Sequence, residues 1–171
     1  DGSGDYLSAG SGPSIVGTGG FSVAAWVRSS AATNQVLVQQ RSPQAYNGQY
    51  VLHLTPAGRA RFWTFGGFSY GPIVASSEAI NDGKWHHVVG VREDDGTTRV
   101  YIDGSLDGSA SGTPRPLVPI NVYIGADLRG GLNYLNGSLD EVRIYDRALD
   151  PREVSDLFLY LPTSDPGIAV D

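Results

Sequence analysis

The stretch Phe21-Ser22-Val23-Ala24-Ala25-Trp26-Val27-Arg28 sets a pattern that the rest of the chain repeats. Large apolar residues alternate along it with small or polar ones, which is typical of a β-strand with one buried face. Similar segments follow it along the chain, separated by short stretches that are rich in turn-forming residues. The pattern predicts further strands over residues 35–40, 49–54, 59–65, 84–92, 99–102, 121–125 and 137–145, with a short strand and a loop over residues 105–119.

The composition agrees with many short strands joined by tight turns. The 171 residues include 23 glycines and 10 prolines, and turn-formers at this density argue against a helical bundle. One helix is predicted over residues 151–158. Asp150 can cap it, Pro151 suits its first position, and Glu153 completes a capping box. The sequence therefore predicts an all-β fold, a two-sheet antiparallel sandwich with one short C-terminal helix.

Length, cysteine content and net charge exclude several classes of protein. A chain of 171 residues suits one domain, and no apolar run approaches the ~20 residues that span a bilayer, so membrane insertion is not expected. The absence of cysteine excludes a disulfide framework, a thiol nucleophile and a thiolate metal site. The net charge of -6 argues against nucleic acid as a partner.

The charged residues are distributed unevenly along the chain. Residues 6–77 contain no aspartate or glutamate but carry four arginines. Residues 92–171 carry 14 acidic residues against seven arginines. The first half is therefore mildly basic and the second half strongly acidic, and a ligand surface built from the first half is expected to tolerate or prefer anionic ligands.

A set of short motifs resembles a known family. The chain is similar to the laminin-G-like, concanavalin-A-like jelly rolls of bacterial secreted enzymes and surface proteins, over about residues 1–160. The resemblance implies a jelly-roll sandwich, a fold that hosts many functions. The motifs are Asp1-Gly2-Ser3-Gly4-Asp5-Tyr6-Leu7, the stretch 21–27, Gly83-Lys84-Trp85-His86-His87-Val88, Val100-Tyr101-Ile102-Asp103-Gly104, Tyr123-Ile124-Gly125 and the stretch 137–149.

The tail suggests a larger parent protein. Residues 166–171, Pro-Gly-Ile-Ala-Val-Asp, resemble the lead-in to the cadherin-like repeats of giant bacterial adhesins. Residues 161–171 carry two prolines and no periodicity, so they are predicted to be a linker toward a following domain. The resemblance implies an extracellular domain on a bacterial cell surface, with flanking domains of the same chain as its neighbours.

The same resemblance implies a structural calcium ion. In this family a Gly-rich turn near the start of the domain and an aspartate of the last strand hold the ion, which corresponds here to Asp1, a carbonyl at Gly4, and Asp140. Calcium takes oxygen ligands from carboxylates and carbonyls, which these residues offer. The alternative is that the Asp-Gly pairs only form turns.

The predicted strand 59–65 suggests a ligand-binding face. If Ala60, Phe62 and Thr64 point inward, then Arg61 and Trp63 point outward. Indole faces stack on sugar rings, and arginine forms bidentate hydrogen bonds. The alternative is that Trp63 fills a groove under a long loop. The candidate ligand residues, including those of neighbouring loops, are Arg41, Tyr46, Arg61, Trp63, Tyr70, Arg129, Asn133 and Tyr134.

The sequence argues against an enzyme. His86 and His87 are adjacent on a strand and point to opposite faces, so they are expected to be structural residues beside a core tryptophan, Trp85, and not a shared metal site. Asp140 and Glu141 diverge for the same reason, and a glycosidase needs two carboxyls in one cleft. The sequence therefore predicts a non-catalytic, calcium-dependent carbohydrate-binding module. The alternative is a protein-interaction or structural module without a sugar site.

Overall fold

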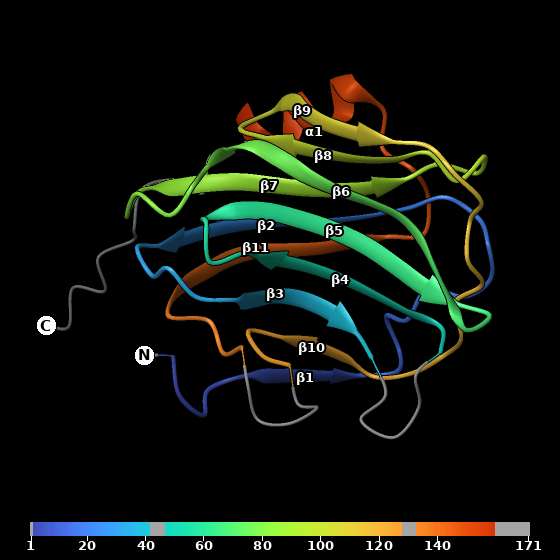
Figure 1. Cartoon of the computed structure of the whole chain (residues 1–171), viewed down its shortest axis with the longest axis horizontal. Coiled ribbons are helices and arrows are strands. Elements are labelled where there is room, and N and C mark those ends of the chain that lie inside the picture. Colours follow the sequence, from blue (N-terminus) through green and yellow to red (C-terminus); the bar gives the residue numbers. More distant parts are fainter. Residues whose placement is uncertain (1, 42–46, 128–132, 160–171) are drawn as a thin grey trace, which may run out of the picture.

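The computed structural model describes residues 2–41, 47–127 and 133–159. Within these residues the chain forms eleven β-strands and one α-helix (Figure 1). No helix in this part of the chain is long and apolar enough to span a lipid bilayer. The elements are β1 (Leu7–Gly10), β2 (Phe21–Ser29), β3 (Gln35–Gln40), β4 (Gln49–Leu54), β5 (Arg59–Gly66), β6 (Ser69–Ala79), β7 (Trp85–Arg92), β8 (Thr98–Ile102), β9 (Ser105–Ala110), β10 (Val122–Ile124), β11 (Gly137–Tyr145) and α1 (Pro151–Leu159).

The strands form two antiparallel sheets. The first has six strands in the order β1-β10-β3-β4-β5-β6, and the second has five in the order β11-β2-β7-β8-β9. Strands β3 to β6 pair in succession as hairpins, and so do β7 to β9, whereas β10 and β11 return from late in the chain to pair with β3 and β2. The two sheets pack as a sandwich, so the all-β jelly roll predicted from the sequence is confirmed.

The core lies between the inner faces of the two sheets, because alternate residues of each strand point inward. Phe21 and Val23 of β2 are fully buried there, and so are Ala60 and Phe62 of β5. The inward phase predicted for β5 is therefore confirmed. The sheets approach closely at Gly90 on β7, where a Cβ would come within 2.5 Å of the Phe62 ring, so no larger residue fits without displacing Phe62.

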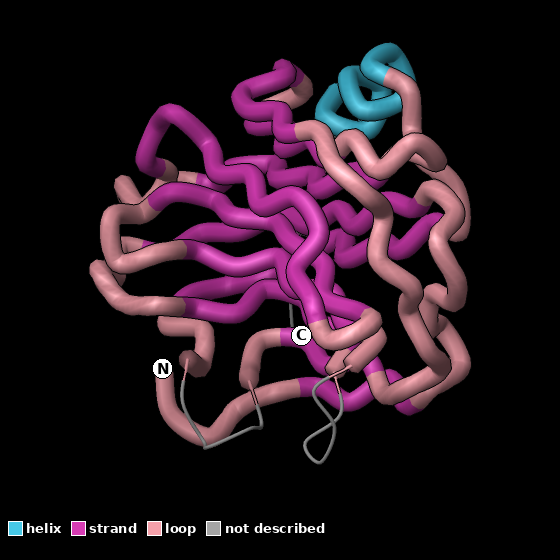
Figure 2. Tube along the Cα trace, turned by 45° about the vertical axis from the view of Figure 1, so that its right-hand side comes forward, coloured by secondary structure: helices cyan, strands magenta, loops and turns pink. Residues whose placement is uncertain are grey.

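Helix α1 covers the outer face of the five-stranded sheet, and it lies outside the strands in Figure 2. Its predicted capping box is present: the Glu153 N–H donates to Asp150 Oδ1 at 2.9 Å, and the Asp150 N–H donates to Glu153 Oε2 at 2.9 Å. Val154 is fully buried against this face with Tyr101. The helix thus begins where the sequence predicts and ends at Leu159, one residue later.

Two strands were not anticipated. The sequence placed the end of a strand at Gly66-Gly67 and loops beyond it, whereas Ser69–Ala79 forms β6, the longest strand of the fold. Leu7–Gly10 likewise forms β1. Both are edge strands of the six-stranded sheet. An edge strand has one unpaired side and tolerates proline, so Pro72 inside β6 does not interrupt the sheet.

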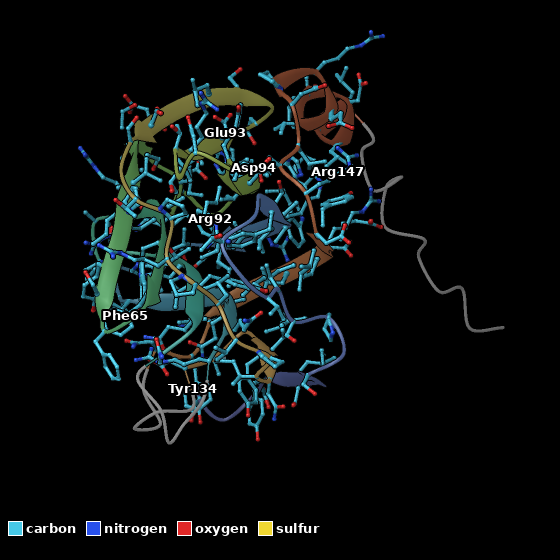
Figure 3. The ribbon with its side chains drawn as sticks, turned by 90° about the vertical axis from the view of Figure 1, so that its right-hand side faces the viewer. Phe65, Arg92, Glu93, Asp94, Tyr134 and Arg147 are labelled. Atoms are coloured by element: carbon cyan, nitrogen blue, oxygen red, sulfur yellow. The ribbon has the colours of Figure 1, made fainter. Side chains whose placement is uncertain are left out.

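A buried arginine joins separate connections at one end of the sandwich. Arg92, fully buried at the end of β7, donates to the carbonyl of Gly19 at 2.6 and 3.1 Å, of Gly17 at 3.2 Å and of Arg115 at 2.8 Å. Its guanidinium lies 4.7 Å from the centroid of the Phe21 ring. Figure 3 shows it in the interior, with Glu93 and Asp94 further along the chain. Burial lowers the pKa of Arg92 to about 10, so it stays charged at neutral pH.

Candidate functional site

The candidate site lies on the outer face of the six-stranded sheet, where β3, β4 and β5 run side by side. The register places Val51 opposite Trp63 and His53 opposite Arg61. Because alternate residues of a strand share a face, all four side chains lie on the face opposite Phe62 and the core. This register places the side chains of Arg61 and Trp63 on the outer face of the sheet, as the alternation along the strand predicts.

A pocket of about 220 Å³ opens on this face. Three strands form its floor, and two segments that follow β10 form one wall. The backbone of the second segment is tied to the sheet, since the Val36 N–H donates to the carbonyl of Asn133 at 3.0 Å. Asn133 itself has a left-handed backbone with φ of 71°, which asparagine tolerates. The lining residues are Asn34, Val36, Arg41, Val51, His53, Trp63, Asp127 and Asn133.

A buried ion pair stands at one side of the pocket. Arg41, directly after β3, donates from Nη1 to Asp127 Oδ2 at 2.7 Å, and both residues are only 7% exposed. Such a pair keeps a donor and an acceptor fixed beside the pocket, because separating them would leave a buried charge without its partner. The sequence predicted Arg41 as a site residue but not Asp127, which lies 86 residues away.

A neutral histidine forms another part of the pocket. Burial, with a further effect of the nearby Arg61 cation, lowers the pKa of His53 to about 4. The ring is therefore uncharged at neutral pH and can both donate and accept a hydrogen bond. Its Nε2 is buried without a hydrogen-bond partner among the described residues, as is Oε1 of Gln39 and of Gln49 on the same face. His53 is a site residue that the sequence pattern did not indicate.

Aromatic rings extend from the pocket along β5 and β6. Trp63 is half-buried, and its ring meets that of Tyr70 edge-on with centroids 5.4 Å apart. Tyr70 also meets Phe65 edge-on at 4.9 Å. Tyr70 is 54% exposed, and it lies on β6 where the sequence had predicted a loop. The rings thus form a continuous group with one end in the pocket.

The structure brings together part of the predicted ligand set. Arg41, Trp63 and Asn133 line the pocket, and Arg61 and Tyr70 adjoin lining residues. Tyr134 is half-buried next to Asn133 in the chain but does not line the pocket. Two predicted residues, Tyr46 and Arg129, lie outside the described residues.

The predicted calcium ligands are only partly described. Asp1 lies outside the described residues. Gly4 is exposed with φ of 86°, and the Oδ1 atom of Asp140, on β11, accepts the Glu141 N–H at 2.8 Å. The described residues contain no cluster of three or more acidic or histidine side chains that could hold a metal ion. The metal site therefore stays a prediction.

The adjacent histidines of β7 point to opposite faces, as expected. His86 Nδ1 lies 2.8 Å from Asp103 Oδ2, whereas the His87 ring packs against Trp26 at 5.3 Å and Phe158 at 6.3 Å. The prediction that Trp85 is a core residue is wrong. Trp85 is 39% exposed, because its side chain lies on the outer face of β7. The tryptophan that packs against His87 is Trp26.

A family model described as the concanavalin A-like lectin/glucanases superfamily matches residues 1–155. The chain belongs to this superfamily. The match confirms the concanavalin-A-like domain inferred from the ordered motifs, and its residues include all the strands described above. Because the superfamily is described as holding both lectins and glucanases, membership does not by itself decide between binding and catalysis.

Solved structures show a similar fold at low sequence identity. The CBM40 domain of the Ruminococcus gnavus IT-sialidase, bound to α2,3-sialyllactose, has a TM-score of 0.69 at 15% identity, and the match covers 84% of each chain. A pentraxin from Limulus polyphemus has a TM-score of 0.65 at 19% identity, covering 84% of this chain and 71% of its own. The receptor-binding domain of botulinum neurotoxin type G has a TM-score of 0.64 at 16% identity. The match covers 82% of this chain and 38% of the neurotoxin chain.

Proposed function

We propose that this domain is a non-catalytic carbohydrate-binding module that holds a sugar in the pocket beside Trp63. One observation carries the proposal. An indole ring, a fixed ion pair and an uncharged histidine line a single pocket on a sandwich of the lectin and glucanase superfamily. Its volume lies below the ~300–1,000 Å³ of pockets for drug-sized ligands, which suits one sugar ring.

The lining groups match the chemistry of a sugar. A pyranose presents an apolar ring face and hydroxyl groups that both donate and accept hydrogen bonds. Trp63 offers an apolar face, Asn133 and the neutral His53 can donate and accept, and the Asp127 carboxylate accepts.

The charge of the face favours an acidic sugar. Asp127 offsets the charge of Arg41, while Arg61 adds a cation beside His53. Residues 6–77, which supply most of this face, contain no acidic residue. The CBM40 structure with sialyllactose, a carboxylated glycan, supports this ligand class for the present fold. We infer that a carboxylated glycan binds better here than its neutral counterpart.

The pocket does not have the arrangement of a glycosidase. Glycoside hydrolysis uses two carboxyls that flank the scissile bond. Among the described lining residues Asp127 is the single carboxylate, and it is ion-paired with Arg41. This supports a binding function without catalysis.

Calcium dependence and the extracellular setting are further parts of the proposal. A calcium ion held by Asp1, the Gly4 carbonyl and Asp140 would tie the first turn of the domain to β11. Gly2 already packs there, since a Cβ on it would lie 3.0 Å from Asn136 Cβ. The sequence resemblance alone supports a place on a bacterial surface protein with flanking domains.

A glycan array tests the proposal. The folded domain is applied with calcium and with EDTA, and 3′-sialyllactose and lactose serve as a matched acidic and neutral pair. We expect binding to a subset of carboxylated glycans without release of shortened products. A folded domain that binds no glycan under either condition would contradict the proposal and leave a protein-interaction or structural role.

A further inference from the structure

The hairpin between β5 and β6 ends in an unusually exposed aromatic residue. Phe68 is 83% exposed, the highest value among the large apolar residues of the described chain. Its φ is 62°, in the left-handed region that bulky residues rarely adopt, and the preceding Gly67 has φ of 58°. Exposure and backbone strain together disfavour phenylalanine here, so its presence points to a contact outside the domain.

The hairpin tip is held in place from three sides. The Gly67 N–H donates to Asn47 Oδ1 at 2.7 Å, and Arg115 Nε donates to the carbonyl of Tyr70 at 2.9 Å. At Gly66 the backbone approaches Pro116 so closely that a Cβ would lie 2.0 Å from the Pro116 carbonyl oxygen. The tip is therefore a fixed platform, and little ordering is needed when it binds a ligand.

The tip follows, along the chain, the row of rings that starts in the pocket. Trp63 lines the pocket, Tyr70 lies against both Trp63 and Phe65, and Phe68 follows at the turn. At about 3.3 Å per residue, the strand from Trp63 to Gly66 covers about 10 Å. Figure 3 shows Phe65 near this end of the sheet, at the margin of the molecule. The row thus reaches well beyond the pocket.

A cation accompanies this row. Arg61 lies two residues before Trp63 on β5, so both side chains are on the same face of the sheet. Arg61 forms no ion pair with a carboxylate in the described parts of the chain. Aromatic rings beside such a cation match a chain of sugar rings that carries carboxylates.

We propose that the ligand is an acidic oligosaccharide of at least two or three residues, one of which occupies the pocket while the next stack on the rings that end at Phe68. This rests on the proposed function and defines its ligand further. A terminal sugar bound only in the pocket would not use Phe68. A longer chain gains affinity from each additional ring that packs on an aromatic side chain.

Isothermal titration calorimetry with glycans of different length tests the proposal. The probes are two monosaccharide and trisaccharide pairs: N-acetylneuraminic acid with 3′-sialyllactose, and galacturonic acid with trigalacturonic acid. In the pair that binds, we expect the trisaccharide to bind about tenfold more tightly than its monosaccharide. Phe68→Asn, which suits the left-handed backbone, should remove most of this gain and leave monosaccharide affinity unchanged. Phe68→Tyr should retain it.

Control variants make the outcomes distinct. Leu106 on β9 is 54% exposed on the other sheet, so Leu106→Asn is a matched loss of exposed apolar surface. This variant should bind both the monosaccharide and the trisaccharide like the wild type.

If Phe68→Asn retains the full gain in affinity with chain length, or if the wild type shows no such gain, the proposal is overturned, while the proposed sugar site in the pocket is not affected. If neither pair binds to the folded domain while the array shows binding to other glycans, the acidic-oligosaccharide proposal is overturned and the proposed function stands; if the array shows no binding either, the proposed function itself fails. If the wild type dimerises in sedimentation and Phe68→Asn does not, the tip binds a second copy and the proposal is overturned.

Discussion

Trp63 is the residue on which the proposed sugar site depends most. Its side chain lies outside the core, so Trp63→Ala should preserve the fold while it removes the stacking surface of the pocket. Truncation of a ligand-facing tryptophan often costs about 2 kcal/mol or more, which is about thirtyfold in affinity. Titration of the best array ligand against wild type and variant measures the loss.

The matched control is Trp85→Ala, which removes an exposed indole from the other sheet. It should bind the ligand like the wild type. A fall in the stability of Trp63→Ala by the roughly 3–5 kcal/mol typical of a core aromatic would instead show that Trp63 supports the fold.

His87 makes stability depend on pH. Burial between Trp26 and Phe158 lowers its pKa from 6.5 to about 4. Above pH 6.5 the ring is neutral in the folded and unfolded chain. As the pH falls from 6.5 to 4, the unfolded chain takes up a proton that the folded chain does not, so stability falls. The loss reaches at most about 3 kcal/mol, since one pKa unit is worth 1.36 kcal/mol.

Thermal melting of wild type and His87→Phe between pH 7 and 4 checks this. Phenylalanine keeps the aromatic contacts and cannot be protonated, so the variant should lose less stability in this window. His53 also has a pKa of about 4 and remains in both proteins, so some loss persists. If the melting temperatures of the two proteins fall equally between pH 7 and 4, His87 does not cause the pH dependence of stability.

The residues of the site differ in how far the sequence could predict them. The outward phase of Trp63 was predictable, because alternation along one strand fixes the face of each residue. Asp127 was not, because it joins the pocket through the pairing of β10 with β3, which are far apart in the sequence. His53 was overlooked, although it lies on the hairpin partner of the Trp63 strand and alternation places it on the same face. Trp85 was misplaced for a related reason: a tryptophan in an apolar run suggests core, and only the register of β7 against β2 shows its face.

At the scale of elements, the cap of α1 should contribute to stability. Asp150 accepts the Glu153 N–H, and Glu153 also pairs with Arg147 through two bonds of 2.7 and 2.8 Å. Asp150→Ala removes the side-chain cap and should destabilise the domain by about 1 kcal/mol. Chemical denaturation measures the effect. The control Asp156→Ala changes an exposed carboxylate whose nearest cationic atom is 4.0 Å away, and should have little effect.

The elements that sequence patterns missed are those whose burial is least regular. Central strands such as β2 and β4 alternate clearly, and the helix carries a complete capping box, so all were predictable. β6 has an exposed or half-exposed residue at most positions, and Gly71-Pro72 interrupts its pattern. Its strand conformation comes from pairing with β5, a long-range contact that local sequence does not encode.

For the whole molecule, the uneven charge should make ligand binding depend on salt. The net charge is -6, yet the ligand face is built mostly from a segment without acidic residues. Raising NaCl from about 0.05 to 0.5 M shortens the screening length severalfold and should weaken binding of an acidic glycan several-fold. A neutral glycan bound in the same pocket should be almost unaffected. Equal salt dependence for both would show that Arg61 does not contact the ligand.

Calcium, if bound as proposed, should stabilise the whole domain by joining its first turn to β11. Binding to the folded state alone adds RT ln(1 + [L]/Kd), or about 2.7 kcal/mol at a hundredfold excess over Kd. Melting in millimolar calcium and in EDTA measures this, with Asp140→Asn as a variant that should lose the response. Identical melting curves in calcium and EDTA would rule out the ion.

The burial of Arg92 has a consequence for the order in which the domain assembles. Its carbonyl partners lie 73 and 75 residues before it and 23 residues after it. A cation cannot leave water until groups that replace its hydration are in position, because an unpaired buried charge is strongly unfavourable. Both connections must therefore arrive before this end of the sandwich can exclude solvent. The strands are free to pair earlier, and closure around Arg92 becomes a late step of folding, since these contacts close long loops.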